Sequence, residues 1–412
     1  MAIRNPWILV AAVLIMTAIM AVVVFGGGAI PLSFSTRPQT TNVLQVPSKY
    51  ATIQAAVNAA SEGDIIQVAP GTYDENIRLN KAVSLTAGTF DQVNAANNAT
   101  VLDGGNSDWT ILIPAGLTQM PTIQGFVVRN SKDGIEAHSE FIAQNNYFYG
   151  SQWSVEYQSG AGGVNRNNVY FNSANDSIHV TDLTRPLLVE NNRFMYAGDD
   201  AIEVDLQGNP AVSTVIEMDI LNNMLVGSGQ DGVKFVDYPS NPQDTNRRIS
   251  IAGNLLANNR RAGIGFMHSG NTNEDYSGAD TAEAVRAYNN TFYGNDYGIS
   301  GGDNLVAFNN IIANSISHAA WRVQGAPDAN SVVAYTLFWR NGGTPTRQRW
   351  GSGTSLSKTH SSWRHPDRAP MERGARLTTI SAVYCCSQAR QPSTKGSPSM
   401  WPLMVRLCLP AH

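Results

Sequence analysis

Short apolar strands recur along the middle of the chain. Each has a central aliphatic residue flanked by polar positions, as in DGIEA at 133–137 and DAIEV at 200–204. Alternation of apolar and polar positions with period two predicts β-strands. The recurring aliphatic residues are Ile135, Val155, Ile178, Ile202, Val233, Ile264 and Ile299.

A column of asparagines keeps step with these strands, each preceding a further short hydrophobic segment. Its members are Asn146, Asn168, Asn192, Asn223, Asn254, Asn290 and Asn310. Asparagine tolerates the left-handed turn conformation, and stacked amides can hydrogen-bond from coil to coil. Two columns that keep step over seven coils are typical of a solenoid. We therefore predict an all-β fold, a right-handed parallel β-helix over residues 46–343.

The start of this region predicts a capping element. Residues 50–60 have apolar positions at helical spacing and precede a strand at 65–68, so we expect an N-terminal helix that covers the first coil. The segment TIQAAVNAASEGDIIQVAPGTYDENI at 52–77 closely resembles the cap and first coil of the pectin-lyase-like superfamily. That resemblance implies the parallel β-helix and says little about the reaction.

Both ends of the chain differ from the coils. Residues 7–25 form a 19-residue run without a charge, which predicts an export signal or membrane anchor over 1–28 and a linker over 29–45. Arg4 precedes the run, so we expect the bulk of the protein to be extracytoplasmic, either secreted or anchored through residues 7–25. Neither the aliphatic column nor the asparagine column continues into residues 344–412, which we interpret as an aperiodic basic tail. A shifted reading frame would explain it, and a disordered tail is the alternative.

Charge is unevenly distributed. The tail holds ten Lys or Arg against two acidic residues, although the whole chain carries -4, so the coils are strongly acidic. This argues against nucleic acid as a partner, because such binding needs clustered basic residues. An acidic polymer would need a bridging cation. All three cysteines lie in the tail, which excludes a disulfide framework or cysteine metal site in the coils.

The later coils are longer than the earlier ones. Successive aliphatic residues are first 20, 23 and 24 residues apart, and then 31, 31 and 35. The extra residues follow the central strands, at 206–213, 237–248 and 268–282. Loops over one face of a solenoid commonly wall a binding surface, and tolerated surface insertions are the alternative reading.

The predicted register gathers charged residues on consecutive coils, because parallel coils stack about 4.8 Å apart. The group comprises Asp176, Asp199, Asp200, Glu203, Asp231, Lys234 and Arg261. Like charges this close raise each other's pKa or recruit a cation. A ligand set of hard oxygens favours calcium. Ordinary turn chemistry of Asp before a strand is the competing explanation.

The run Asp199-Asp200-x-x-Glu203, with Asp176 one coil before and Lys234 one coil after, looks like the site of pectate lyases of polysaccharide lyase family nine. That family has Asp where this chain has Glu203. The resemblance implies that the four carboxylates hold calcium. It also implies that Lys234, as a neutral amine, removes a carbon-bound proton and starts β-elimination.

Three further residues complete the expected site as substrate-binding groups, namely Arg261, Asp231 and His179. A guanidinium can clamp a carboxylate in bidentate fashion. The substrate that this site predicts is an acidic polysaccharide of the polyuronate class.

Two other functions remain open on the sequence. Gly198-Asp199-Asp200 also resembles an element of polygalacturonases, and Asp176 and Asp231 would lie about 9.6 Å apart, at the upper limit for an inverting acid–base pair. The Asn-Thr-Asp, Gly-His-Gly and Arg-Ile-Lys elements of that family are lacking, however. The third possibility is a non-catalytic carbohydrate-binding or structural surface protein whose acidic column holds calcium for rigidity.

Overall fold

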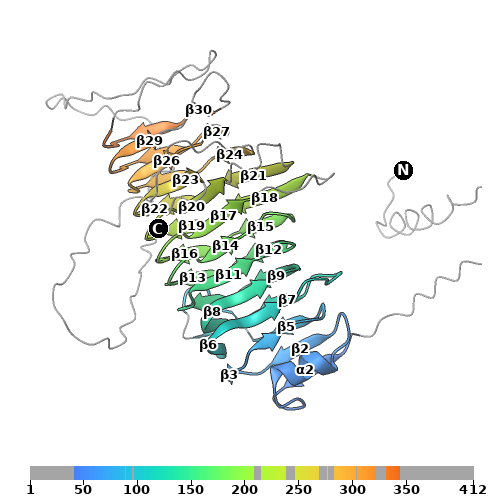
Figure 1. Cartoon of the computed structure of the whole chain (residues 1–412). Coiled ribbons are helices and arrows are strands. Elements are labelled where there is room, and N and C mark those ends of the chain that lie inside the picture. Colours follow the sequence, from blue (N-terminus) through green and yellow to red (C-terminus); the bar gives the residue numbers. More distant parts are fainter. Residues whose placement is uncertain are drawn as a thin grey trace, which may run out of the picture. The chain divides into compact units, whose positions relative to one another are not determined.

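The computed structural model describes residues 41–343, except 89, 95–96, 208–214, 238–245, 269–275, 277–282, 303 and 322–330. This part is a right-handed parallel β-helix, as the sequence predicts (Figure 1). The expected export segment, residues 29–40 of the linker, the basic tail and most of the three insertions lie outside the described residues. Over the described ranges, no helix has both the length and the apolar character needed to cross a membrane.

The strands of successive coils form three parallel ladders. The first ladder has twelve strands and is continuous from one end of the described solenoid to the other. Its strands are β1 (Val43–Val46), β2 (Ile65–Val68), β5 (Ser84–Thr86), β7 (Thr122–Gln124), β9 (Glu140–Gln144), β12 (Gly162–Arg166), β15 (Leu187–Glu190), β18 (Ile216–Leu221), β21 (Arg247–Ala252), β24 (Ala284–Tyr288), β27 (Leu305–Phe308) and β30 (Val332–Ala334).

The second and third ladders share two long strands, β6 (Thr100–Ile113) and β8 (Val127–Ala137), which pair in both. The remaining strands of the second ladder are β3 (Gly71–Asp74), β10 (Tyr147–Tyr149), β13 (Val169–Phe171), β16 (Arg193–Met195), β19 (Met224–Val226), β22 (Leu255–Ala257), β25 (Thr291–Tyr293), β28 (Ile311–Ala313) and β31 (Leu337–Trp339). Those of the third are β4 (Ile77–Arg78), β11 (Trp153–Tyr157), β14 (Ile178–Val180), β17 (Ile202–Leu206), β20 (Val233–Asp237), β23 (Ala262–His268), β26 (Tyr297–Ser300) and β29 (His318–Trp321).

The predicted cap is present as helix α2 (Ile53–Ala59), blue in Figure 1. The Thr52 hydroxyl accepts a hydrogen bond from the Ala55 N–H at 3.1 Å, and the Glu75 carboxylate accepts from the N–H groups of Ile53 and Gln54 at 2.9 and 3.0 Å. These oxygens satisfy N–H groups that have no partner within the helix. Ile53 is fully buried, so the helix packs against the first coil as expected.

The column of central aliphatic residues fills the core, and every member is fully buried. Val155 pairs with Ile178, Ile178 with Ile202, and Ile202 with Val233 in adjacent strands. The predicted register of the coils is therefore confirmed.

The asparagine column is a buried hydrogen-bond ladder, also as predicted. The backbone N–H of Asn192 donates to Oδ1 of Asn223 at 2.9 Å, and that of Asn223 donates to Oδ1 of Asn254 at 2.8 Å. One detail of the prediction is wrong: the left-handed residue is the one before each ladder asparagine, such as Asn191 and Asn222, both with φ 55°. The ladder asparagine needs its side chain inside the coil, so its exposed neighbour makes the turn.

Candidate functional site

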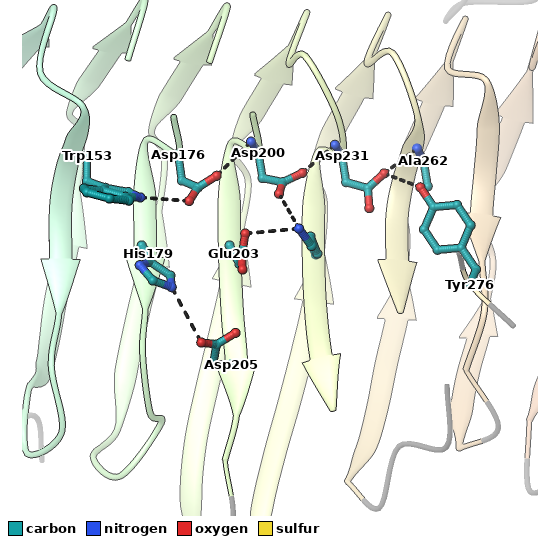
Figure 2. Close-up of polar contacts among 10 residues, drawn as sticks. Trp153, Asp176, His179, Asp200, Glu203, Asp205, Asp231, Ala262 and Tyr276 are labelled. Carbon is teal, nitrogen blue, oxygen red and sulfur yellow. Dashed lines mark hydrogen bonds and ion pairs between the residues drawn. The ribbon is translucent and has the colours of Figure 1, made fainter. Parts of the chain in front are cut away.

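Four consecutive strands of the third ladder carry the candidate site: β14, β17, β20 and β23. Their register pairs His179 with Glu203, Glu203 with Lys234, and Lys234 with Gly265. These residues follow the buried aliphatic by one position, so strand alternation turns them away from the core. Figure 2 shows the side chains of His179 and Glu203 on neighbouring strands, below a row of aspartates.

That row, here called the acidic row, consists of Asp176, Asp200 and Asp231, each just before a strand. All three are almost completely buried. Oδ1 of Asp176 accepts the N–H of Asp200 at 2.9 Å, and Oδ1 of Asp200 accepts the N–H of Asp231 at 2.6 Å. The acidic row is therefore a structural ladder like that of the asparagines, with one oxygen of each carboxylate committed to the next coil.

The second oxygens of Asp176 and Asp200 have different surroundings. Oδ2 of Asp176 accepts the indole N–H of Trp153 at 3.1 Å. Oδ2 of Asp200 is buried without a hydrogen bond and lies 3.3 Å from Nζ of Lys234. This oxygen is directed toward the lysine side chain on the next strand (Figure 2).

Lys234 lies between two carboxylates and is buried to all but 7%. Its Nζ is 3.2 Å from Oε2 of Glu203 and 3.3 Å from Oδ2 of Asp200. The carboxylates of Glu203 and Asp200 therefore both contact the ammonium group of Lys234. The predicted neighbourhood of Lys234 and Asp200 on one face and on adjacent coils is present.

Three carboxylates could hold a metal ion at this point. Asp176, Asp200 and Glu203 each offer an oxygen, and these oxygens lie within 4.8 Å of one another. The donors are all hard oxygens, and one of them, Oδ2 of Asp200, is buried without a hydrogen bond, so the residues fit calcium or a similar cation. Lys234 would have to give up its ion pairs when such a cation binds.

Two other predicted residues are not among these three ligands. Asp199 is half-buried, and its backbone carbonyl accepts the N–H of Gln230 at 2.8 Å, while its carboxylate is not one of the three ligands. Arg261 is exposed, on the coil after Lys234. Its backbone N–H donates to the carbonyl of Gln230 at 3.0 Å.

Three aspartates at the site, Asp176, Asp199 and Asp200, have raised pKa values. Burial, with Glu203 and Asp199 as charged neighbours, raises the pKa of Asp176 to about 7. Burial raises the pKa of Asp200 well above its usual value, against the opposing effect of Lys234. The pKa of Asp199 is also raised by burial. A bound cation would reverse this tendency, because it favours the ionised carboxylates.

His179 lies beside the metal group and between two more acids. Its Nδ1 is 3.7 Å from Glu156 and its Nε2 is 3.7 Å from Asp205. Burial opposes protonation, but Asp205, Glu156 and Glu203 outweigh it and raise the pKa of His179 to about 10. Asp205 was not foreseen as a site residue. The available signal was strand alternation, since Asp205 is two positions after Glu203 in β17.

Tyr276 closes the other end of the acidic row. Its hydroxyl donates to Oδ1 of Asp231 at 2.7 Å, and the same oxygen accepts the N–H of Ala262 at 2.6 Å. Gly265 makes room, because a Cβ there would collide with Asp231 and approach Tyr276 Cε1 to 2.7 Å. Tyr276 could not be predicted as a site residue, because it belongs to an insertion without coil periodicity.

Comparison with known proteins extends the description of the fold. No family model matches the sequence, and no curated protein matches it either. The A-module of a mannuronan C-5 epimerase from Azotobacter vinelandii is 18% identical, with 69% of this chain and 94% of that one covered and a TM-score of 0.37. An alginate lyase from Paenibacillus sp. strain FPU-7 is 15% identical, with 73% and 96% covered and a TM-score of 0.32.

A protein named as a surface adhesin, from Streptococcus pneumoniae, is also similar. It is 12% identical, with 70% of this chain and 87% of that one covered, and the TM-score is 0.35. Likeness at this level concerns the fold and transfers no activity. The site itself must carry any argument about function.

Proposed function

We propose that the protein acts on polysaccharides outside the cytoplasm, as a calcium-dependent lyase of polyuronates that works by β-elimination. One observation carries the proposal: Asp176, Asp200 and Glu203 converge within 4.8 Å beside the buried amine of Lys234. A cation site next to an amine is what the reaction needs, because the substrate carboxylate must be neutralised while the adjacent carbon loses a proton.

Different residues of the site would have different roles in the β-elimination. Calcium held by Asp176, Asp200 and Glu203 would bind the substrate carboxylate and acidify the neighbouring C–H. Lys234, released from its two carboxylate partners, would accept that proton as a neutral amine. The electron pair of the C–H bond forms a carbon–carbon double bond. The glycosidic oxygen leaves the adjacent carbon with its bonding electrons and takes a proton from water to become a hydroxyl group. Arg261 and His179 remain the substrate-binding residues of the proposal. Asp231, predicted with them, is fully buried and bonded to Ala262 and Tyr276, so it would support the site from within the coil.

A structural protein that binds carbohydrate or calcium without catalysis is the second candidate. The acidic row favours it, because each Oδ1 accepts a backbone N–H of the next coil and so has a role in folding. A hydrolase of polygalacturonase type would use Asp176 and Asp231 as an acid–base pair. Both carboxylates are almost fully buried and hydrogen-bonded, which leaves this third function the weakest of the three.

Product analysis tests the proposal. Purified protein is incubated with pectate, alginate and other polyuronates, with calcium or with a chelator, and ultraviolet absorbance is followed. We expect unsaturated products with calcium and their loss with the chelator. Reducing ends without ultraviolet absorbance would identify a hydrolase. If no polyuronate gives either signal, the function as a non-catalytic structural protein is supported instead.

Substitution of Lys234 tests its role as the base. Lys234→Ala should lower kcat by at least about a hundredfold, since general-base catalysis contributes on that scale. Lys132→Ala is the matched control: Lys132 is a half-exposed lysine that lies 5.2 Å from the Trp153 ring, outside the three-carboxylate group. Full activity of Lys234→Ala would disprove the assignment.

A further inference from the structure

The corner between the second and third ladders contains a residue of left-handed backbone conformation in successive coils. From the coil of β10 onward these residues have φ between 51° and 75° and are Gly150, Asn172, Tyr196, Gly227, Asn258, Gly294, Asn314 and Arg340. Glycine and asparagine adopt this conformation readily, whereas a bulky side chain makes it costly. Arg340 belongs to the last described coil. Tyr196, with φ 60°, is a bulky residue at this corner in the middle of the solenoid, where the neighbouring coils have glycine or asparagine.

Burial of the Tyr196 side chain offsets little of this cost, because 52% of the residue is exposed. The ring lies beside Gly227, where a Cβ would come within 2.8 Å of Cδ1 and 3.0 Å of Cε1. Its neighbour on the other side is Phe171, in an edge contact with ring centroids 5.9 Å apart. A strained backbone that holds a half-exposed ring over a glycine is a feature that typically marks a functional position.

Tyr196 is the end of a row of aromatic residues, one on each of three consecutive coils. Tyr149 stacks on Phe171 with ring centroids 5.9 Å apart, and 42% of Tyr149 is exposed. Coils repeat about every 4.8 Å along the axis, which is close to the length of one pyranose unit in an extended chain. Aromatic rings bind the C–H faces of pyranose rings, while the sugar hydroxyls stay in water.

We propose that Tyr196, supported by Phe171 and Tyr149, is a binding subsite for a pyranose ring of a carbohydrate chain. Tyr196 lies in the connection between β16 and β17, which also holds Asp199 and Asp200. The inference rests on the proposed function in taking a polysaccharide as the ligand, and it does not require that the chain be cleaved.

Electrophoresis of the protein in gels that contain pectate or alginate tests the subsite. Tyr196→Asn should weaken retardation in the gel that retards the wild type, by about three- to tenfold in apparent Kd, the scale of one aromatic contact. Tyr196→Phe keeps the ring and should bind like the wild type. The melting temperature of Tyr196→Asn should not fall, because Asn172 and Asn258 already occupy the equivalent position in other coils.

Tyr335→Asn is the matched control. Tyr335 has φ 50° and is 80% exposed, at the corner where Asn289 and Asn309 are the equivalent residues. Its substitution relieves the same backbone strain away from the aromatic row, so binding should not change.

Three results would overturn the subsite. These are wild-type affinity in Tyr196→Asn, a melting temperature of that variant lowered by several degrees, or no retardation of the wild type by either polymer. A change in oligomeric state without polysaccharide binding would instead assign the row to contact between copies. Retardation that depends on Tyr196, with no unsaturated product, would refute the lyase and keep the subsite.

Discussion

At the scale of single residues, the site is built from carboxyl groups with divided roles. One oxygen of Asp200 accepts the N–H of Asp231, and the other lies 3.3 Å from Lys234. The first contact stabilises the coil, and the second is available for chemistry. The sequence pattern of an Asp before a strand is therefore compatible with a structural role in the turn and with a role as a metal ligand. In Asp200 the same side chain can fill both roles.

Asp133 offers a test of buried-carboxyl energetics away from the metal group. Burial, together with the charge of Glu156, raises its pKa to about 7. The folded state therefore binds this proton more tightly than the unfolded state, and the resulting stability is present below about pH 4 and lost as pH rises toward 7. Asp133→Asn should match the wild type at pH 4 and melt several degrees higher near pH 8.

The measurement is thermal unfolding of both proteins at each pH. Comparing the two at the same pH removes the contributions of other titrating groups, such as His179. A constant difference between the melting temperatures from pH 4 to 8 would contradict a raised pKa.

At the scale of elements, the register was predictable because each coil repeats the same chemistry. Two columns, one aliphatic and one of asparagines, determined which residues are neighbours, and with them the pairing of Glu203 with Lys234. Contacts outside this repetition were not predictable. The Tyr276 hydroxyl reaches Asp231 from an insertion, and the Trp153 indole reaches Asp176 across a coil by its side-chain conformation.

The asparagine ladder should contribute strongly to stability. The side chain of Asn223 accepts from Asn192 and donates to the carbonyl of Val189 and to Asn254, all in a buried environment. Asn223→Ala leaves the Asn192 N–H and the Val189 carbonyl buried without these partners. We expect a loss of about 2–4 kcal/mol, measured as a lower urea midpoint.

The neighbouring position provides the control for this experiment. Asn222 is exposed and has φ 55°, a conformation that glycine also adopts. Asn222→Gly should therefore change the urea midpoint little. Equal losses in the two variants would show that the turn, rather than the buried amide, stabilises the coil.

At the scale of the whole molecule, stability and the proposed chemistry are linked through the cation. A ligand that binds the folded chain alone stabilises it, by about 2.7 kcal/mol at a hundredfold excess over Kd. Calcium should thus raise the melting temperature by a few degrees, and a chelator should reverse the change. Magnesium should do less, because it demands stricter geometry. Differential scanning fluorimetry measures all three conditions.

Glu203→Gln is the variant that assigns this effect to the site, because it removes one of the three carboxylates and keeps the size of the side chain. It should abolish most of the calcium shift. A shift that persists in Glu203→Gln would place the bound cation elsewhere, and no shift in the wild type would argue against a calcium site altogether.

The asparagine ladder limits the places where residues can be inserted into this solenoid. From Asn146 onward, the corner before the second ladder is bonded amide to amide, so an added residue there would break a continuous chain of hydrogen bonds. Among the described residues, the corner after the third ladder has no such chain. The long connections between β17 and β18, between β20 and β21 and between β23 and β24 follow this ladder. The length and sequence of these connections can therefore change in evolution while the scaffold that aligns Glu203 with Lys234 stays unaltered.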